Sequence, residues 1–438
     1  MSLMDFLLVL TPGLPLLLIM PRLRRFIPRV KYVAILPALV LLILPGDHFV
    51  ELPWLLFNAG FACVGETRLL LLMAVLLWFT AAFYFSNSEG NEDRVAYEHH
   101  SAFYLLTLGG HLGAILATDV VSFFTFSTLM GYGFYALLVN AGDELVKRSG
   151  RIYLCFMVMA DLLLFEAVLL AASVTEEQSF DAVREAMVSS SYSGMYVSIV
   201  VLGFALKAGL WPLHYWLSLA YRSARPPVVV LLAGVPVAIG LLGIVRWLPL
   251  GEITLPAMAM IAQGLGAAAM VYVLLSGLIQ RQLKALSAYV TIFATGLFVV
   301  GLGTVLRNPD VWTTLAHMVP VFIFSLSIGL ALLTTAISWL VDKVPSLHMQ
   351  EKQSDNTTLW FERWSGKIVA QGRVMGLDTL PRLRARCLAT AESCLQIHAW
   401  KKALQTGEFT LQRWTLAITL LLLVAMTVVL LVVTGWKF

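Results

Sequence analysis

The sequence predicts an all-α, polytopic membrane bundle of about 12 transmembrane helices, and three observations lead to this fold class. Of the 438 residues, 59% are hydrophobic and 13% are charged, whereas a soluble domain carries about 25% charged residues. The mean hydropathy is +0.83. The apolar residues form continuous runs long enough to cross a hydrocarbon core about 30 Å thick, and not the alternating strands of a membrane barrel. A soluble globular protein and a disordered chain are both excluded.

Twelve apolar runs are candidate crossings. The first is followed, not preceded, by its basic cluster, so it does not have the pattern of a cleavable signal peptide. The expected crossings are 3–20, 30–46, 68–86, 101–117, 119–140, 152–174, 195–217, 227–249, 254–279, 284–305, 312–341 and 413–435.

The charges between these runs predict which side each loop faces. Loops after odd-numbered runs hold 24 of the 30 Lys and Arg residues, and the other side holds five, namely Arg68, Arg184, Arg246, Arg307 and Lys437. Because Lys and Arg concentrate on the inner side of a membrane, both termini are expected outside. One missed or invented crossing would scramble this asymmetry, which therefore favours an even number of crossings.

Residues 342–412 form the only long polar stretch of the sequence. Within it, residues 380–404 place apolar side chains at helical spacing with Arg and Lys between them. This pattern predicts an amphipathic helix on the inner membrane surface or along neighbouring subunits. A small soluble domain is the alternative, but so few aliphatic residues make a poor core. We expect a transmembrane bundle at 1–341, the inner-side segment at 342–412 and an anchor helix at 413–438.

An ionisable side chain within a membrane span is costly and is by default a candidate functional group. Lys207 lies in the middle of the seventh run, and a buried lysine can lose its proton, as a proton carrier must. Pro212 follows five residues later and predicts a helix break, a feature that often lines an ion path. His214 comes next and titrates near neutral pH. The alternatives are a lysine paired only for packing and a hydrogen-bonded histidine near a helix end.

Two acidic residues, Asp161 and Glu166, lie in the sixth run. Five residues are about 500° of helix, so the two side chains point about 140° apart and cannot both face one partner. Glu166 lies deeper in the run. We therefore expect Glu166 to be the better candidate for the counter-ion of Lys207, with Asp161 in that place, or a purely structural role, as the alternatives.

Two further histidines, His111 and His317, stand alone in apolar surroundings. Each is either a relay group or a hydrogen-bonded packing residue. Pro320 lies three residues after His317 and predicts a second kinked or broken helix.

The sequence carries no motif for a redox centre, a cofactor or a metal. Its four cysteines form no CxxC pair, and it has no Gly-rich nucleotide loop, iron–sulfur pattern or haem motif. The net charge of +4 is too small to indicate nucleic-acid binding. We therefore expect no cofactor, no metal, no nucleic-acid partner and no catalytic redox centre on this chain.

Three sequence blocks resemble the antiporter-like membrane subunits of respiratory complex I, Mrp-type cation/proton antiporters and membrane-bound hydrogenases. FALKAGLWPLHYWLSLAYRSARPPVVVLLAG is similar to their seventh span, QLKALSAYVTIFATGLFVVGLG to their tenth, and LATDVVSFFTFSTLMGYGFYALL to their fifth. The resemblance covers 65–335. The matching positions are Lys207, Pro212, His214, Trp216, Leu217, Pro227, Val228, Leu231 and Leu232, then Lys284, Leu286, Ala288, Tyr289 and Gly296, and Asp119 in the third block.

The resemblance implies internal inverted repeats, two broken helices and a central polar axis along which protons pass between buried lysines, histidines and waters. It implies a bacterial inner (cytoplasmic) membrane and a multi-subunit complex. The implied partners are other membrane subunits, a further antiporter-like subunit, a peripheral or redox module, lipid, and protons or sodium ions. Lys284 opens its span near the inner surface, as an entrance group or as an ordinary positive-inside anchor.

The chain departs from this family pattern at three usually charged positions. The fifth-span glutamate, which in the family pairs with the seventh-span lysine, is replaced by Thr128. The eighth-span histidine or lysine is replaced by Ala233, and the lysine expected four residues after His317 by Val321.

Three functions therefore remain open. The first is a proton-translocating or cation/proton antiport subunit with a half-channel centred on Lys207. The second is a degenerate subunit with a structural or coupling role, and the third is a membrane partner for inorganic-carbon uptake. Oxygen-bearing residues are sparse near Lys207, which favours protons over sodium. The expected proton path uses Lys207, Glu166, Asp161, His214, Lys284, His111 and His317.

Overall fold

The computed structural model describes residues 3–343, apart from 21, 24–29, 54, 56–57, 89–93, 140–143 and 278–282. The chain divides into two compact units, Met1–Leu340 and Val341–Phe438, and all but the last three described residues belong to the first. The expected inner-side segment at 342–412, with its amphipathic helix, lies outside the described residues except for its first two. The expected anchor helix at 413–438 lies wholly outside them.

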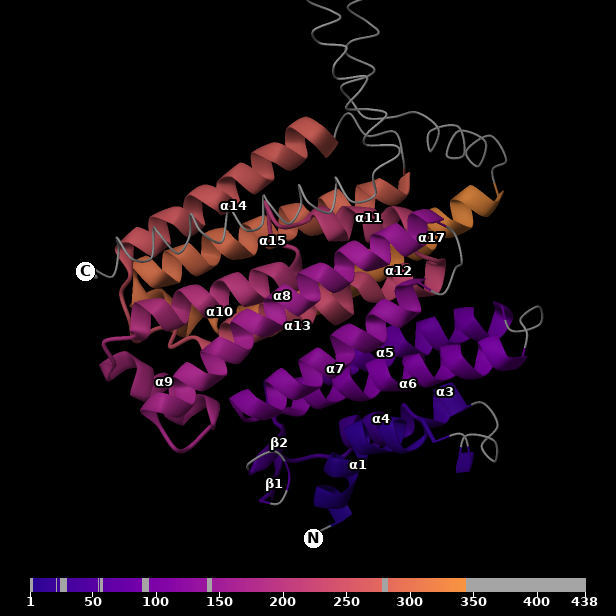
Figure 1. Cartoon of the computed structure of the whole chain (residues 1–438), viewed down its shortest axis with the longest axis horizontal. Coiled ribbons are helices and arrows are strands. Elements are labelled where there is room, and N and C mark those ends of the chain that lie inside the picture. Colours follow the sequence, from indigo (N-terminus) through magenta and orange to yellow (C-terminus); the bar gives the residue numbers. More distant parts are fainter. Residues whose placement is uncertain are drawn as a thin grey trace, which may run out of the picture. The chain divides into compact units, whose positions relative to one another are not determined.

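The described part is built mainly of helices (Figure 1). In chain order the elements are α1 (Leu3–Leu17), α3 (Val30–Val33), α4 (Leu36–Ile43), β1 (His48–Leu52), β2 (Ala59–Cys63), α5 (Gly65–Ser88), α6 (Arg94–Leu116), α7 (Val120–Val139), α8 (Glu144–Val174), α9 (Phe180–Ser189), α10 (Ser193–Ala208), α11 (Tyr215–Ser223), α12 (Pro226–Leu232), the π-helix η2 (Ala233–Val237), α13 (Ala238–Trp247), α14 (Pro256–Gly277), α15 (Leu283–Arg307), the 3₁₀-helix η3 (Pro309–Val311), α16 (Trp312–Leu315) and α17 (Met318–Lys343).

Seven helical segments of the described part are long and apolar enough to cross a membrane. They are Gly65–Phe85, Val120–Val139, Leu145–Val174, Pro226–Trp247, Pro256–Leu275, Ala285–Arg307 and Met318–Trp339. Three shorter apolar segments accompany them, Met4–Leu17, Val30–Ile43 and Ser193–Ala208. The helical, membrane-type fold is thus confirmed, whereas the number of 12 crossings and the inverted repeats stay predictions.

The bundle is mostly helical, as expected, and it also contains one short β-hairpin that was not expected. β1 and β2 form an antiparallel hairpin, paired from His48 opposite Cys63 to Leu52 opposite Ala59. Five-residue strands carry too little periodicity to be recognised among so many apolar residues. The hairpin joins the short link between α6 and α7, where Phe61 pairs with Ala117.

Asp119 stabilises the link between α6 and α7 through buried hydrogen bonds. Its carboxylate accepts hydrogen bonds from the backbone N–H groups of Gly60 (3.1 Å) and Ser122 (2.7 Å), so it ties β2 to the first turn of α7. A carboxylate is well placed at a helix N-terminus, where backbone donors lack partners. Burial raises the pKa of Asp119, although the hydrogen bonds from Ser122 and Gly60 act in the opposite direction.

Arg246, in the last turn of α13, reinforces the same link. Its guanidinium donates to the backbone carbonyls of Ala114 and Ala117, both at 3.1 Å, at the end of α6. It also lies over the rings of Phe123 and Phe180, about 6 Å from each centroid. A cation is favoured beside the unpaired carbonyls of a helix C-terminus. Arg246 was expected only to mark the outer side, but it also joins α13 to α6, α7 and α9.

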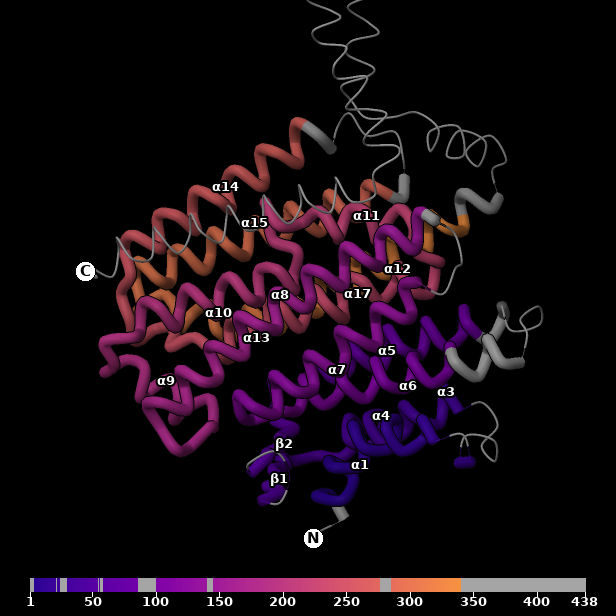
Figure 2. The backbone as a smooth tube through the Cα atoms, viewed as in Figure 1, coloured from indigo at the N-terminus to yellow at the C-terminus, as the bar shows by residue number. Residues whose placement is uncertain are grey.

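Glycines allow the central helices to approach closely. A Cβ atom at Gly110 of α6 would lie 2.6 Å from the backbone nitrogen of Met130 in α7, and one at Gly133 of α7 would lie 2.5 Å from the hydroxyl of Thr107. The two helices run side by side (Figure 2). Small residues at such contacts are typical of helix packing in membranes, where close backbone approach replaces the hydrophobic driving force.

The seventh apolar run is broken, as expected. α10 ends at Ala208, Gly209 adopts a left-handed conformation with φ of 63°, and α11 begins only at Tyr215. Pro212 lies within the break. The left-handed residue requires a glycine in practice, because other residues pay a steric penalty there.

The other helix irregularities were only partly foreseen. The π-helix η2 interrupts the eighth apolar run around Pro236 and was not expected. Pro320 was expected to break or kink its span, but it lies in the first turn of α17, where a proline is tolerated. The irregular backbone falls just before it, between the end of α16 and the start of α17.

Candidate functional site

The centre of the bundle holds a lysine–aspartate pair. The Nζ atom of Lys207 in α10 lies 2.8 Å from Oδ1 of Asp161 in α8, and it donates a hydrogen bond of 2.9 Å to the hydroxyl of Ser127 in α7. The hydroxyl of Thr128 donates to the same Asp161 oxygen at 3.1 Å. The side chain of Lys207 is 1% exposed and that of Asp161 is 10% exposed. Three helices thus converge on one buried charge pair.

The helix break places the lysine at this point. Lys207 is the penultimate residue of α10, in the last turn of the helix, where the helix dipole favours a cation. The backbone carbonyl of Leu206, in the same turn, accepts a hydrogen bond of 3.0 Å from the indole N–H of Trp216 in α11. A residue that flanks the break therefore donates a hydrogen bond to a backbone carbonyl at the end of α10, as a buried backbone requires.

The counter-ion of Lys207 is Asp161, and the expectation of Glu166 is corrected. The two acidic side chains do point to different faces of α8, as their spacing predicted, but the face toward Lys207 belongs to Asp161. Glu166 is exposed on the opposite side of the helix. Its greater depth along the run was a poor guide, because direction around the helix axis decides which group meets a partner.

Sequence reasoning missed three of the pair's polar neighbours. Ser127 and Thr128 are consecutive hydroxyl residues at the place of the family's glutamate, and this pattern was a usable signal. Tyr132 of α7, one turn further on, has its hydroxyl hydrogen-bonded to Asp161. Tyr132 is 40% exposed, so the aspartate end of the pair lies nearer the protein surface than the lysine end.

An aromatic cluster lies one turn from Lys207, toward the N-terminal end of α10. Phe204 packs edge-on against Phe123 and Trp247, with ring centroids 5.8 and 5.2 Å away. All three are fully buried. A Cβ atom at Gly243 would lie 2.2 Å from the Phe204 ring, so this glycine makes room for it. The bundle is packed tightly with rings on this side of the pair.

Polar side chains lie on the other side of the break. Nε2 of His214 is 3.3 Å from the hydroxyl of Tyr272 in α14, and the rings of Tyr272 and Tyr289 are 6.2 Å apart. The hydroxyl of Thr291 in α15 donates to that of Tyr221 in α11 at 3.1 Å. Lys284 belongs to the first turn of α15, but its side chain lies outside the described residues.

His111 is part of a separate buried contact. Its Nδ1 accepts a hydrogen bond of 2.9 Å from the indole N–H of Trp78. Because an indole N–H can only donate, Nδ1 must be unprotonated, and a neutral His111 carries its proton on Nε2. The backbone of Gly234 in η2 lies beside this imidazole. With its lone pair already used, His111 cannot accept a proton unless the Trp78 contact breaks.

His317 does not lie inside a span. It occupies the irregular backbone before α17, and its Nδ1 is 3.2 Å from Oε1 of Glu66 in the first turn of α5. Both side chains are well exposed. The expectation of an intramembrane relay histidine is therefore corrected to a contact between two helix ends.

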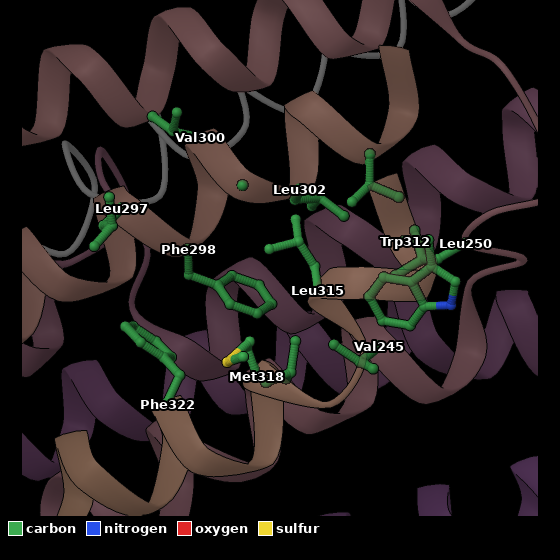
Figure 3. A pocket seen from close by; sticks show the side chains of 13 residues that line it. Val245, Leu250, Leu297, Phe298, Val300, Leu302, Trp312, Leu315, Met318 and Phe322 are labelled. Carbon is green, nitrogen blue, oxygen red and sulfur yellow. The ribbon is translucent and has the colours of Figure 1, made fainter. Parts of the chain in front are cut away.

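An apolar cavity of about 310 Å³ lies between α13, α15, α16 and α17 (Figure 3). Val245, Leu250, Phe298, Trp312 and Phe322 are among its lining residues, none of which is ionisable. Apolar cavities stay free of water. None of its lining residues belongs to the Lys207 site, so this cavity is separate from the Lys207 pair.

The fold and the buried pair define a polytopic membrane protein in which a broken helix holds a lysine against a carboxylate. The chain belongs to the NADH:quinone oxidoreductase/Mrp antiporter transmembrane family, whose model matches residues 117–349. The match includes Thr128, Asp161, Lys207 and the helix break.

Curated relatives come from three kinds of complex. NADH-quinone oxidoreductase subunit N of Pelobacter propionicus is 28% identical over 207 residues, which are 46% of this chain and 44% of the relative. A component of a probable K⁺/H⁺ antiporter of Rhizobium meliloti is 33% identical over 134 residues, 30% and 25% of the two chains. Hydrogenase-4 component B of Escherichia coli is 25% identical over 178 residues, 40% and 26%. The matched region spans less than half of each relative.

Two solved structures share the fold. An archaeal membrane-bound sulfane sulfur reductase matches with a TM-score of 0.63 and 17% identity, over 77% of this chain and 71% of that chain. The Mrp complex of Dietzia sp. matches with a TM-score of 0.64 and 20% identity, over 77% and 64%. The expected resemblance to antiporter-like membrane subunits is confirmed.

Proposed function

We propose that this chain is a proton-translocating subunit of a multi-subunit membrane complex, with the Lys207–Asp161 pair as its charge-carrying centre. The single observation that supports this most is the 2.8 Å contact between these two side chains within the bundle. A buried ion pair contributes little net stability compared with apolar packing. Its presence beside a helix break therefore fits a functional role better than a structural one.

The pair supplies the chemistry of a proton carrier. With Asp161 and Ser127 in place, Lys207 keeps its proton; when the ammonium is drawn away from Asp161, burial without a counter-charge favours release of that proton. Thr128 and Tyr132 hold the carboxylate, so the lysine is the mobile partner. A lysine side chain is long and flexible enough to change partners without backbone movement.

The route from the pair toward the inner surface would use His214 and then Lys284. His214 lies in the same break and contacts Tyr272, and Lys284 begins the neighbouring helix α15. Glu166, His111 and His317 are not part of this proposed route. Glu166 faces away, His111 has its acceptor nitrogen occupied, and His317 lies at an exposed helix end.

Protons suit the site better than sodium ions. A sodium site needs several oxygen ligands around an empty position. Here the oxygens of Ser127 and Asp161 already surround the Lys207 ammonium, which occupies the place that a cation would take.

A structural or coupling subunit is the second candidate, and one observation favours it. The aromatic cluster of Phe123, Phe204 and Trp247 fills the bundle on one side of the pair. Protons would reach that side only by movement of these rings or by a sideways path.

Transport measurements on the whole complex separate the two candidates. Lys207→Ala and Asp161→Asn are introduced, and proton uptake by native membrane vesicles is followed with a pH-sensitive dye. The proposal is supported if the variants assemble into normal amounts of complex while proton uptake falls by the part that this chain contributes. Lys147→Ala, which removes an exposed lysine of α8, is the matched control. Unchanged uptake in Lys207→Ala would leave the structural role.

A further inference from the structure

A stripe of exposed side chains runs along α8 on the side away from Lys207. It consists of Cys155, Leu162, Glu166 and Leu169, at intervals of seven, four and three residues. At about 100° per residue these four lie within about 60° of one another. Leu162 is 66% exposed and Leu169 is 50% exposed. We call these four residues the α8 stripe; their spacing is that of one helix packing along another.

Glu166 makes the α8 stripe unlike an ordinary lipid-facing surface. It lies 15 residues after Arg151, about 22 Å along the helix, and eight residues, about 12 Å, before the helix ends at Val174. Leu162, Leu169 and the exposed ring of Phe165 surround it. No hydrogen bond or ion pair joins Glu166 to any other described residue. A carboxylate facing hydrocarbon at this depth is costly, and such groups normally meet a protein partner.

We infer that the α8 stripe docks a transmembrane helix of a different subunit, which carries a Lys or Arg side chain opposite Glu166. The inference rests on the proposed function only in that it needs a multi-subunit complex. Charge complementarity selects this occupant, because a cation is the group that best offsets a carboxylate in a low-dielectric surrounding.

No apolar span of this chain, described or expected, offers an unpaired cation at the depth of Glu166. The apolar run 413–435 carries one charged residue, Arg413, at its start, and that end is expected at the inner surface, away from Glu166. A second copy docked about a two-fold axis would place Glu166 against Glu166, which is repulsive. Within the described spans, the cations Lys207 and Arg246 are already paired with Asp161 and with backbone carbonyls.

The docked helix would lie close to the charge pair. Tyr132 of α7 is 40% exposed and contacts the Asp161 carboxylate, and the rings of Phe124 and Phe165 join α7 to α8 at the edge of the α8 stripe, with centroids 6.1 Å apart. Only the width of one helix, filled with apolar protein, would separate a cation at Glu166 from Asp161. Its positive charge would therefore act electrostatically on the Asp161 carboxylate. The neighbouring subunit could in this way bias the pairing of Lys207.

Photo-crosslinking in native membranes tests the inference. A benzoyl-phenylalanine replaces Leu162, or Leu332 of α17 as the control, which is equally exposed at 66%. The expected result is a Leu162 adduct whose partner peptide is a transmembrane segment of another subunit with Lys or Arg within one helical turn, and lipid adducts from position 332. Lipid adducts alone at 162, an adduct with this chain, or a partner segment without a cation would each overturn the inference.

Charge variants give a second measurement that does not depend on crosslinking yield. In Glu166→Gln, the amount of partner subunit in the purified complex should fall by about tenfold or less. In Glu166→Lys, the partner subunit should be absent from the purified complex. Changing the identified partner cation to Glu should restore assembly with Glu166→Lys; failure of this exchange contradicts the pairing. Lys207→Ala should keep the crosslink even if proton uptake is lost, so failure of the docking inference and failure of the proposed function are distinguishable.

Discussion

The hydroxyl of Thr128 on α7 donates a hydrogen bond to the carboxylate of Asp161 on α8, with 3.1 Å between the two oxygens. Thr128 stands where the family pattern has a glutamate. The carboxylate that meets Lys207 is therefore still present in this chain, but it comes from the adjacent helix. Loss of the glutamate from the sequence does not mean loss of the charge pair.

This relationship predicts that the carboxylate can be moved back to α7. Asp161→Ala leaves Lys207 without a counter-charge, and removing one partner of a buried pair costs about 3–5 kcal/mol. We expect a large loss of thermal stability and of proton uptake. Adding Thr128→Glu to Asp161→Ala should restore most of both, since a longer side chain from α7 reaches the same ammonium.

Thermal unfolding of the purified complex and dye-monitored uptake check this exchange. Thr128→Glu alone is the informative control. It places two carboxylates beside one lysine, so we expect it to be less active than the double variant. If the double variant were no better than Asp161→Ala, the two positions would not be interchangeable.

A second prediction concerns the Ser127 hydroxyl, which accepts a 2.9 Å hydrogen bond from Lys207. Removing a hydrogen bond to a charged group costs about 1.5–3 kcal/mol. Ser127→Ala should therefore lower the unfolding temperature by a few degrees, less than Asp161→Ala does, because the ion pair survives. Ser173→Ala, which removes an exposed hydroxyl of α8, should leave the unfolding temperature unchanged. An equal effect of the two serine variants would contradict the assigned contact.

His111 gives a third prediction, because its contact with Trp78 is structural. His111→Ala leaves the buried indole N–H without an acceptor, which costs about 1–3 kcal/mol besides the cavity. His111→Gln offers a carbonyl oxygen in place of Nδ1 and should recover part of that stability. Proton uptake per assembled complex should stay near the wild-type value in both variants. A selective loss of uptake in His111→Gln, with normal stability, would return His111 to the proton path.

Much of this architecture could be predicted from the sequence, for identifiable physical reasons. Long apolar runs have few structural options in a membrane, so the helical fold followed from composition alone. The break after Ala208 followed from Gly209 and Pro212, whose backbone restrictions act locally. Lys207 was recognised as a candidate functional residue because a charged side chain within an apolar run is costly and is usually functional.

The partners of Lys207 could not be identified in the same way. The spacing of Asp161 and Glu166 showed that only one of them could face the lysine, but the rotation of α8 is decided by packing with α7 and α10. Glycines such as Gly203, where an added Cβ would lie 2.8 Å from Leu164, contribute to that packing. His317 was misplaced for a related reason: an apolar run does not reveal which of its ends contains the irregular backbone.

The last prediction concerns pH and Asp119. Burial raises the pKa of this carboxyl above its ordinary value of 3.8. At a pH between the ordinary and the raised pKa, the folded chain therefore binds more protons than the unfolded chain. Stability contributed by Asp119 is therefore complete below pH 3.8 and is lost as the pH rises through the raised pKa. Asp119→Asn cannot ionise, and its single carbonyl oxygen can accept only one of the two hydrogen bonds from Gly60 and Ser122, a loss that is the same at every pH. The unfolding temperature of the wild type minus that of Asp119→Asn should fall as the pH rises above the ordinary value of 3.8, and it should level off once the pH exceeds the raised pKa. Asp181→Asn, an exposed carboxyl in α9, serves as the control. A difference that rises with pH would mean that the ionised carboxylate is the form that holds β2 to α7.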